Sequence, residues 1–148
     1  MFKVKLKQGE LNRFKKEVLK EWNDQVQAKL ITLLDRALEL QWVRFRPEGY
    51  NDDTGQLRSS TGYILFLDGK VIHEKFELSI YGTDRAPGLK EGRDYAFKFL
   101  RKSKGFGAVF VAGMDYAGYV QAMSLSVLAH AEMEIDKNLW RELDEIRI

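Results

Sequence analysis

The sequence predicts an α+β fold in one domain covering residues 1–148, in which an antiparallel sheet of about four strands packs against three helices. Three observations lead to this prediction. A stretch from Gln8 to Phe45 keeps one apolar face at helical spacing, an Asp-Gly pair at 68–69 joins two β-rich runs, and a nearly all-apolar run covers Phe106 to Ala112. The hydrophobic content of 45% and charge content of 31% fit a globular protein with a core.

The N-terminal region predicts one long helix. Met1 to Lys7 alternates apolar residues with lysine, which indicates either an edge strand or a tail that orders against a partner. After it, apolar residues recur every three or four positions: Leu11, Phe14, Val18, Trp22, Val26, Leu30, Leu33, Ala37 and Leu40. A helix of ~35 residues would measure about 50 Å, which exceeds the ~26 Å diameter of a compact domain. We therefore expect a kink near Asn23-Asp24, two helices packed on one sheet, or an end that projects and needs a partner.

A β-hairpin follows. Pro47 ends the helix, and Asp52 or Asp53 can cap a short helical turn. Asp68-Gly69 predicts a type I′ turn between strands, because both central residues of that turn need a positive φ. Pairing across it would set Leu67 opposite Lys70, Leu65 opposite Ile72 and Tyr63 opposite Glu74. Leu65, Leu67, Ile72 and Phe76 would then share the core face, with His73 on the other face.

The second half of the chain predicts a loop, two helices and further strands. Ser79 to Gly88 is a loop, and Leu89 to Ser103 is a helix with Leu89, Ala96, Phe99 and Leu100 inward. Phe106 to Ala112 is a central strand because it is nearly all apolar. Tyr116 to Met123 is expected to form a helical turn and Leu125 to Ala129 a strand. Leu128, Ile135, Leu139, Leu143 and Ile146 mark a C-terminal helix.

The composition argues against an enzyme. The chain has no cysteine, which excludes disulfides, thiolate zinc sites and cysteine nucleophiles. His73 and His130 stand alone, without carboxylates at metal-ligand spacing, and no serine lies in a nucleophile elbow. The chain lacks a phosphate-binding glycine loop, a secretory signal and an apolar run of ~18 residues that could span a membrane. We therefore expect no catalytic residue, cofactor, metal or membrane partner.

One segment offers a nucleic-acid alternative. Lys104 to Val111 resembles the RNA-recognition octapeptide, with Phe106 placed to stack on a base. Ala108 and Val111 stand where that motif has aromatic residues. A glycine-capped helix that leads into a core strand explains the same residues. The alternative function is therefore a small nucleic-acid-binding module that uses the basic and aromatic stretch Lys98 to Phe110, although a net charge of +2 is too balanced for phosphate binding over the whole surface.

Large aromatic residues on wide helix faces are candidate interface anchors, namely Trp42, Phe97 and Trp140. In the segment Asp53 to Ser60, Thr54 can cap, Gly55 permits a tight turn, Leu57 can plug the core, and Arg58 offers a planar donor fork. In a later segment Tyr116, Ala117 and Tyr119 would lie on one helical turn. Local packing and contact between subunits both explain these two segments.

These two motifs carry a resemblance to a known family. Thr54 to Ser60, the hairpin after it and Asp115 to Gln121 resemble, in order and spacing, the small head–tail joining or tail-completion proteins of tailed bacteriophages. The family pattern is a long N-terminal helix, then Thr-Gly-x-Leu-Arg-x-Ser leading into strands, and later Tyr-Ala-x-Tyr-Val-Glu. Gln121 replaces the last glutamate, and the family's usual continuation is absent after Ala122.

The resemblance implies a virion structural protein located at the neck or tail end, and in the host cytoplasm during assembly. It would form a ring of copies of itself between the portal or adaptor and the tail-tube proteins. DNA would pass through the ring without sequence-specific binding.

Overall fold

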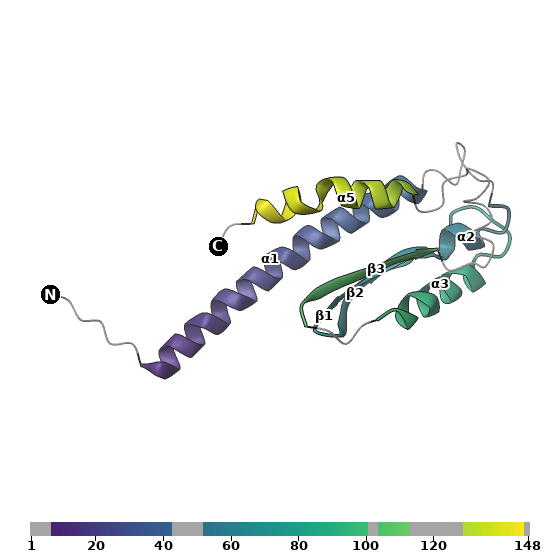
Figure 1. Ribbon diagram of the computed structural model, residues 1–148. Helices are drawn as coiled ribbons and strands as arrows, with labels where there is room; N and C mark the ends of the chain where they lie inside the picture. The colour runs from purple at the N-terminus through teal and green to yellow at the C-terminus, as the bar shows by residue number, and fades with distance from the viewer. Residues whose placement is uncertain (1–6, 43–51, 101–103, 113–128, 147–148) are drawn as a thin grey trace.

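The computed structural model describes residues 7–42, 52–100, 104–112 and 129–146, and confirms the α+β class (Figure 1). The elements are α1 (Gln8–Trp42), α2 (Gln56–Ser59), β1 (Thr61–Leu67), β2 (Lys70–Lys75), α3 (Ala86–Lys98), β3 (Phe106–Ala112) and α5 (Ala129–Asp144). Within the described residues the sheet has three antiparallel strands in the order β2-β1-β3, rather than the four expected. The strand expected over Met1 to Lys7 and the elements expected from Tyr116 to Leu128 lie outside the described residues, and Ala129 begins α5.

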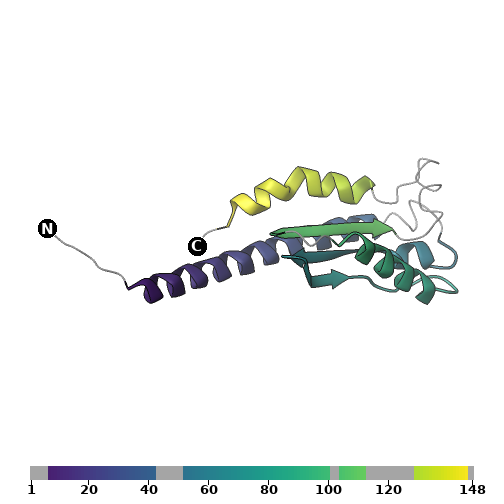
Figure 2. The ribbon, with the colours of Figure 1, turned by 60° about the horizontal axis from the view of Figure 1, so that its bottom comes forward.

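The long helix is continuous. It runs for 35 residues without a break at Asn23-Asp24, which corresponds to about 52 Å at 1.5 Å per residue. Figures 1 and 2 show that its first half extends beyond both the sheet and α5. Of the three arrangements that the sequence left open, the projecting helix is the one observed.

The sheet is buried on both faces, which explains why six consecutive residues of β1 are buried. On one face α1 lies against β1, and α5 runs antiparallel to α1 (Figures 1 and 2). Its core contains Leu34, Leu38, Trp42, Leu57, Tyr63 and Leu65. On the opposite face α3 covers a smaller cluster of Ile64, Ala96 and Val111. The elements thus form a helix pair, a sheet and a further helix in successive layers.

The predicted turn is correct, but the predicted pairing holds only next to it. Asp68 and Gly69 have φ angles of 52° and 80°, as a type I′ turn requires, and Leu67 pairs with Lys70. An irregularity between Leu65 and Phe66 then shifts the register by one residue. A bulge of this kind moves every later side chain relative to its partner strand.

Two predicted side-chain placements are wrong as a result of this bulge. Leu65 pairs with His73 rather than Ile72, and Tyr63 pairs with Lys75 rather than Glu74. His73 therefore lies on the α1 side, with its ring centroid 5.9 Å from that of Tyr63. Phe76, which was expected beside Leu65 and Ile72, packs instead against the α3 cluster.

The helix α3 begins three residues earlier than expected and ends at Lys98, before the expected Ser103, with Phe99 as its C-terminal cap. Ala96 is buried and Leu100 packs against the α3 cluster, as predicted. Phe99 was expected inward but is exposed, and its ring meets that of Tyr95 edge-on at 5.0 Å. Gly88 and Gly92 are buried on the face that was expected to carry larger side chains, and the reason for this lies in the contact with α2.

Candidate interaction surface

The segment Asp52 to Ser60, which contains the Thr-Gly-x-Leu-Arg motif, is closed by its own hydrogen bonds. The Asp52 carbonyl accepts from the amide of Gly55 at 3.2 Å, and Asp52 Oδ2 accepts from the amide of Arg58 at 2.8 Å. Thr54 Oγ1 accepts from the amide of Gln56 at 3.2 Å. Gly55 has a φ of +76°, a conformation that costs a glycine little. The motif therefore builds a fixed turn that leads directly into β1.

This turn holds a second loop that is distant in sequence. The Ser59 hydroxyl accepts from the amide of Ser79 at 2.8 Å and donates to the carbonyl of Gly55. The amides of Thr83 and Asp84 donate to the carbonyls of Asp53 and Thr54 at 3.2 and 3.0 Å. The backbone of residues 79–84 is thus fastened to the motif at both ends. We call this arrangement the clamp.

Close approach between backbones also explains the glycines of α3. A Cβ built on Gly88 would lie 2.2 Å from the Gln56 carbonyl oxygen, and one on Gly92 would lie 2.1 Å from that of Ser60. Both distances are well below any ordinary contact, so α3 can pack on α2 only because these two positions lack side chains. Sequence reasoning missed this pair, although the four-residue spacing of Gly88 and Gly92 was a usable signal.

Leu57, Arg58 and Trp42 point into their own chain. Leu57 is fully buried in the α1 cluster, as the sequence predicted for a core plug. The Arg58 guanidinium lies 4.4 Å from the centroid of the Trp42 ring, and its Nη1 donates to the Leu78 carbonyl at 3.4 Å. Burial lowers the pKa of Arg58, while Glu77, Asp52 and Glu39 oppose that shift. Trp42 is only 7% exposed, and its Nε1 donates to the Thr61 carbonyl at 3.3 Å. In this chain Trp42 is a core residue rather than an exposed anchor.

The clamp presents apolar side chains to solvent. Leu78, Ile80 and Tyr81 lie on or next to the clamped loop and are exposed, Ile80 by 74%. We call these three residues the apolar loop. Sequence reasoning treated this region only as a polar connection, although Leu78-Ser79-Ile80-Tyr81 is an apolar run within it. A fixed backbone with exposed aliphatic and aromatic side chains is suited to binding another protein, because little order has to be created on docking.

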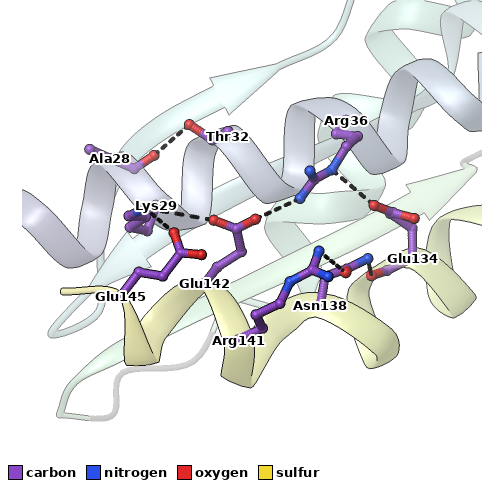
Figure 3. A network of polar contacts seen from close by, with 9 residues as sticks. All are labelled: Ala28, Lys29, Thr32, Arg36, Glu134, Asn138, Arg141, Glu142 and Glu145. Carbon is purple, nitrogen blue, oxygen red and sulfur yellow. Dashed lines mark hydrogen bonds and ion pairs between the residues drawn. The ribbon is translucent and has the colours of Figure 1, made fainter.

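An ion-pair network fixes α5 on the second half of α1 (Figure 3). Arg36 contacts Glu134 at 2.8 Å and Glu142 at 3.0 Å, and Lys29 contacts Glu145 at 2.9 Å and Glu142 at 3.8 Å. The hydrogen bond between Lys29 and Glu145 raises the pKa of Lys29 and lowers that of Glu145. The network runs from Arg36 back to Lys29, which lies opposite the end of α5.

Beyond this network, the first half of α1 carries an exposed apolar stripe. Phe14 and Leu19 are 63% and 59% exposed, and Trp22 is 42% exposed. Leu11 and Val18 on the same half are partly buried. Trp140, a predicted anchor on α5, is 73% exposed, whereas Phe97 packs on the α3 cluster with Arg93 above its ring at 4.8 Å.

Three kinds of sequence prediction remain: one on an interface motif, one on metal sites and one on membrane spans. Tyr116, Ala117 and Tyr119 lie outside the described residues. Within the described ranges, His, Cys, Asp and Glu side chains form no group of three or more that could hold a metal ion. No helix in the described part of the chain combines the length and the apolar character needed to cross a membrane.

The octapeptide that resembles an RNA-binding motif lies mostly on β3. Phe110 stacks on Tyr63 with ring centroids 6.2 Å apart and packs on the face covered by α1. A Cβ on Gly107 would lie 2.3 Å from the Phe66 ring, so the absence of a side chain at this position lets the Phe66 ring pack against β3. Val109, Phe110 and Val111 pack in the core clusters, whereas Phe106 is half-buried and Lys104 and Ala108 are exposed.

Comparisons with protein-family models, curated proteins and solved structures gave no match to this chain. In the part of the chain that the structure describes, exposed apolar side chains gather on the apolar loop and on the first half of α1, and Tyr95, Phe99 and Trp140 are exposed elsewhere.

Proposed function

We propose that this protein is a virion structural component, a head–tail connector or tail-completion protein that assembles as a ring between portal and tail. One observation carries the proposal. The motif Thr54 to Ser60, on which the resemblance to such proteins rests, is a closed clamp that holds the apolar loop outward. The motif residues therefore maintain a docking surface.

The energetics of docking support this role. An interface gains most from a few aromatic or aliphatic anchors that become fully desolvated. Ile80 and Tyr81 are such side chains, and the hydrogen bonds at Ser79, Thr83 and Asp84 already hold their backbone. The partners that the resemblance implies are the portal or adaptor on one side and the tail tube on the other. The site of action would be the virion, after assembly in the host cytoplasm.

Complementation tests this function. A phage whose copy of this gene is inactivated should accumulate filled heads and separate tails, and the wild-type chain supplied in trans should restore joined particles. Ile80→Asp should fold normally but fail to restore joining, whereas the matched variant Ile80→Val should restore it. Normal joining without the chain would refute the proposed function. Full restoration by Ile80→Asp would show that the apolar loop takes no part in joining.

The nucleic-acid alternative gains no support from the sheet. That role needs stacking aromatic side chains on an open face. On β3, Phe110 packs against Tyr63 under α1, and Phe106, the residue expected to stack on a base, is half-buried. Titration with labelled single-stranded RNA separates the two functions. A virion joining protein should show no tight binding that weakens steeply with salt.

A further inference from the structure

The exposed apolar stripe on the first half of α1 lies on the same side of the helix that α5 covers on the second half. At about 100° per residue, Leu11, Phe14, Val18 and Trp22 fall within a sector of roughly 80° around the helix. Lys29 and Arg36, which hold α5, fall in the same sector. The helix thus offers one continuous packing surface, and α5 occupies only its second half (Figures 1 and 3). A further helix laid on the first half would extend packing that the molecule already uses.

Charge is distributed unequally along the two flanks of this stripe. Glu10, Glu17 and Asp24 repeat every seven residues along one flank, and Glu21 lies on the same flank closer to the stripe. Lys15 is the basic residue next to the other edge of the stripe, where it follows Trp22 around the helix. Glu17 pairs with Arg13 at 3.8 Å, but both side chains are at least 70% exposed, so this contact is weak. The acidic flank therefore remains negatively charged despite this ion pair.

We propose that residues 8–25 of α1 are the surface through which copies of this chain associate, side by side and in parallel. This inference deepens the proposed function, on which it rests for its biological setting, by naming the surface at which copies meet. The occupant is a second copy because the flanks of one α1 complement those of another. In a parallel pair, the acidic flank of one helix faces the flank of its neighbour that carries Lys15.

The opposite orientation is disfavoured by the same charges. Antiparallel packing of two identical helices places each flank against the same flank of the partner. Glu10, Glu17 and Asp24 would then face one another, and like charges across a helix pair repel. Parallel packing also keeps every helix at one angle to a common axis, which rotational assembly into a ring requires.

Sedimentation equilibrium with the full chain tests the surface. The wild-type chain should associate as concentration rises. Phe14→Ser should weaken association roughly thirtyfold, as expected for loss of a central aromatic anchor. Lys15→Glu should weaken it roughly fivefold, because acid then faces acid. Lys20→Glu makes the same charge change on the opposite side of the helix and should leave association unchanged. A chain that stays monomeric at every concentration reached, or equal effects of Lys15→Glu and Lys20→Glu, would overturn the inference.

The orientation can be read by cross-linking, because the chain has no native cysteine. Leu11 and Gln25 lie in one row of the stripe, fourteen residues apart. In parallel packing, Leu11→Cys alone and Gln25→Cys alone should each give cross-linked dimers with a short bismaleimide, and a mixture should give no additional product. Cross-linking only in the mixture would show antiparallel packing and overturn the inference.

Complementation separates this inference from the proposed function. If Phe14→Ser associates as well as the wild-type chain while the wild-type chain restores joined particles, the inference fails and the function stands. If inactivation of the gene leaves joining normal, the function fails, and the cross-linking result still decides how copies pack.

Discussion

A single methyl group on α3 tests the close approach of this helix to the end of α2. Helix propensity alone predicts that Gly92→Ala stabilises α3 by about 1 kcal/mol, because alanine is the better helix former. The structure predicts the opposite sign. The added Cβ would lie 2.1 Å from the Ser60 carbonyl oxygen, whereas ordinary contact begins at 3.4 Å, so α3 has to move away by up to 1.3 Å, the difference between these distances. That movement would loosen the fully buried Ala96 in the α3 cluster.

The magnitude follows from overpacking. Forcing an extra methyl group into a closed contact costs about 1–3 kcal/mol, and the upper end applies here because the obstacle is backbone. After subtracting the propensity gain, we expect a net loss of about 2 kcal/mol, which lowers the melting temperature by roughly 4–8 °C in a chain of this length. Thermal and urea unfolding of both proteins measure this loss.

The matched control is Gly9→Ala in α1, where an added Cβ meets nothing within 4 Å. This variant should show no loss of stability. If Gly92→Ala is no less stable than the wild-type chain, as expected for Gly9→Ala, the close approach of α3 to the end of α2 is not present and this account of their packing is wrong.

Three further substitutions test other contacts. Leu57→Ala should cost about 2–5 kcal/mol, measured by urea unfolding, because a fully buried core side chain leaves a cavity. Ser59→Ala should cost about 1–3 kcal/mol because the buried amide of Ser79 loses its acceptor, and limited proteolysis should then cut within residues 78–85 faster than in the wild-type chain. Glu145→Gln tests the pH dependence. The folded-state pKa of Glu145 lies below its ordinary value of 4.5, so the contribution of its pair with Lys29 is present above that value and is lost as pH falls through the folded pKa. The difference in melting temperature between this variant and the wild type should therefore shrink as the pH is lowered below 4.5, and a difference that stays constant as the solution is acidified would contradict the assignment.

The sequence predicted elements more reliably than it predicted what they contact. Unbroken helical periodicity from Leu11 to Leu40 predicted a helical stretch at this place, although it left open whether the stretch is one helix, a kinked helix or two helices. The same pattern could not show which part of the stripe is covered, because periodicity identifies a face and says nothing about its partner. The bulge between Leu65 and Phe66 also had no signal in the sequence. It placed His73 and Phe76 on the sides of the sheet opposite those expected.

The candidate motif shows the same limit. Residue types alone indicated that Gly55 forms a turn and Leu57 plugs the core, and the structure bears out both. The clamp could not be predicted, because its second half, Ser79 to Asp84, lies some twenty residues further along the chain and is joined through backbone groups. Arg58 was predicted to offer a planar donor fork, but its place over the Trp42 ring and its hydrogen bond to the Leu78 carbonyl had no signal in the sequence.

The two exposed surfaces differ in what the fold itself requires of them. The apolar loop is tied to the core, because the hydrogen bonds that fix it also close the turn before β1. The first half of α1 contributes no residue to either core cluster, so folding of the body does not require its apolar stripe. It is helical because it propagates from a packed second half and therefore needs no nucleation of its own. Keeping Phe14, Leu19 and Trp22 in water has an unfavourable free energy that the isolated chain does not recover. A covering partner recovers it, and the charge flanks of the helix match a second copy of itself.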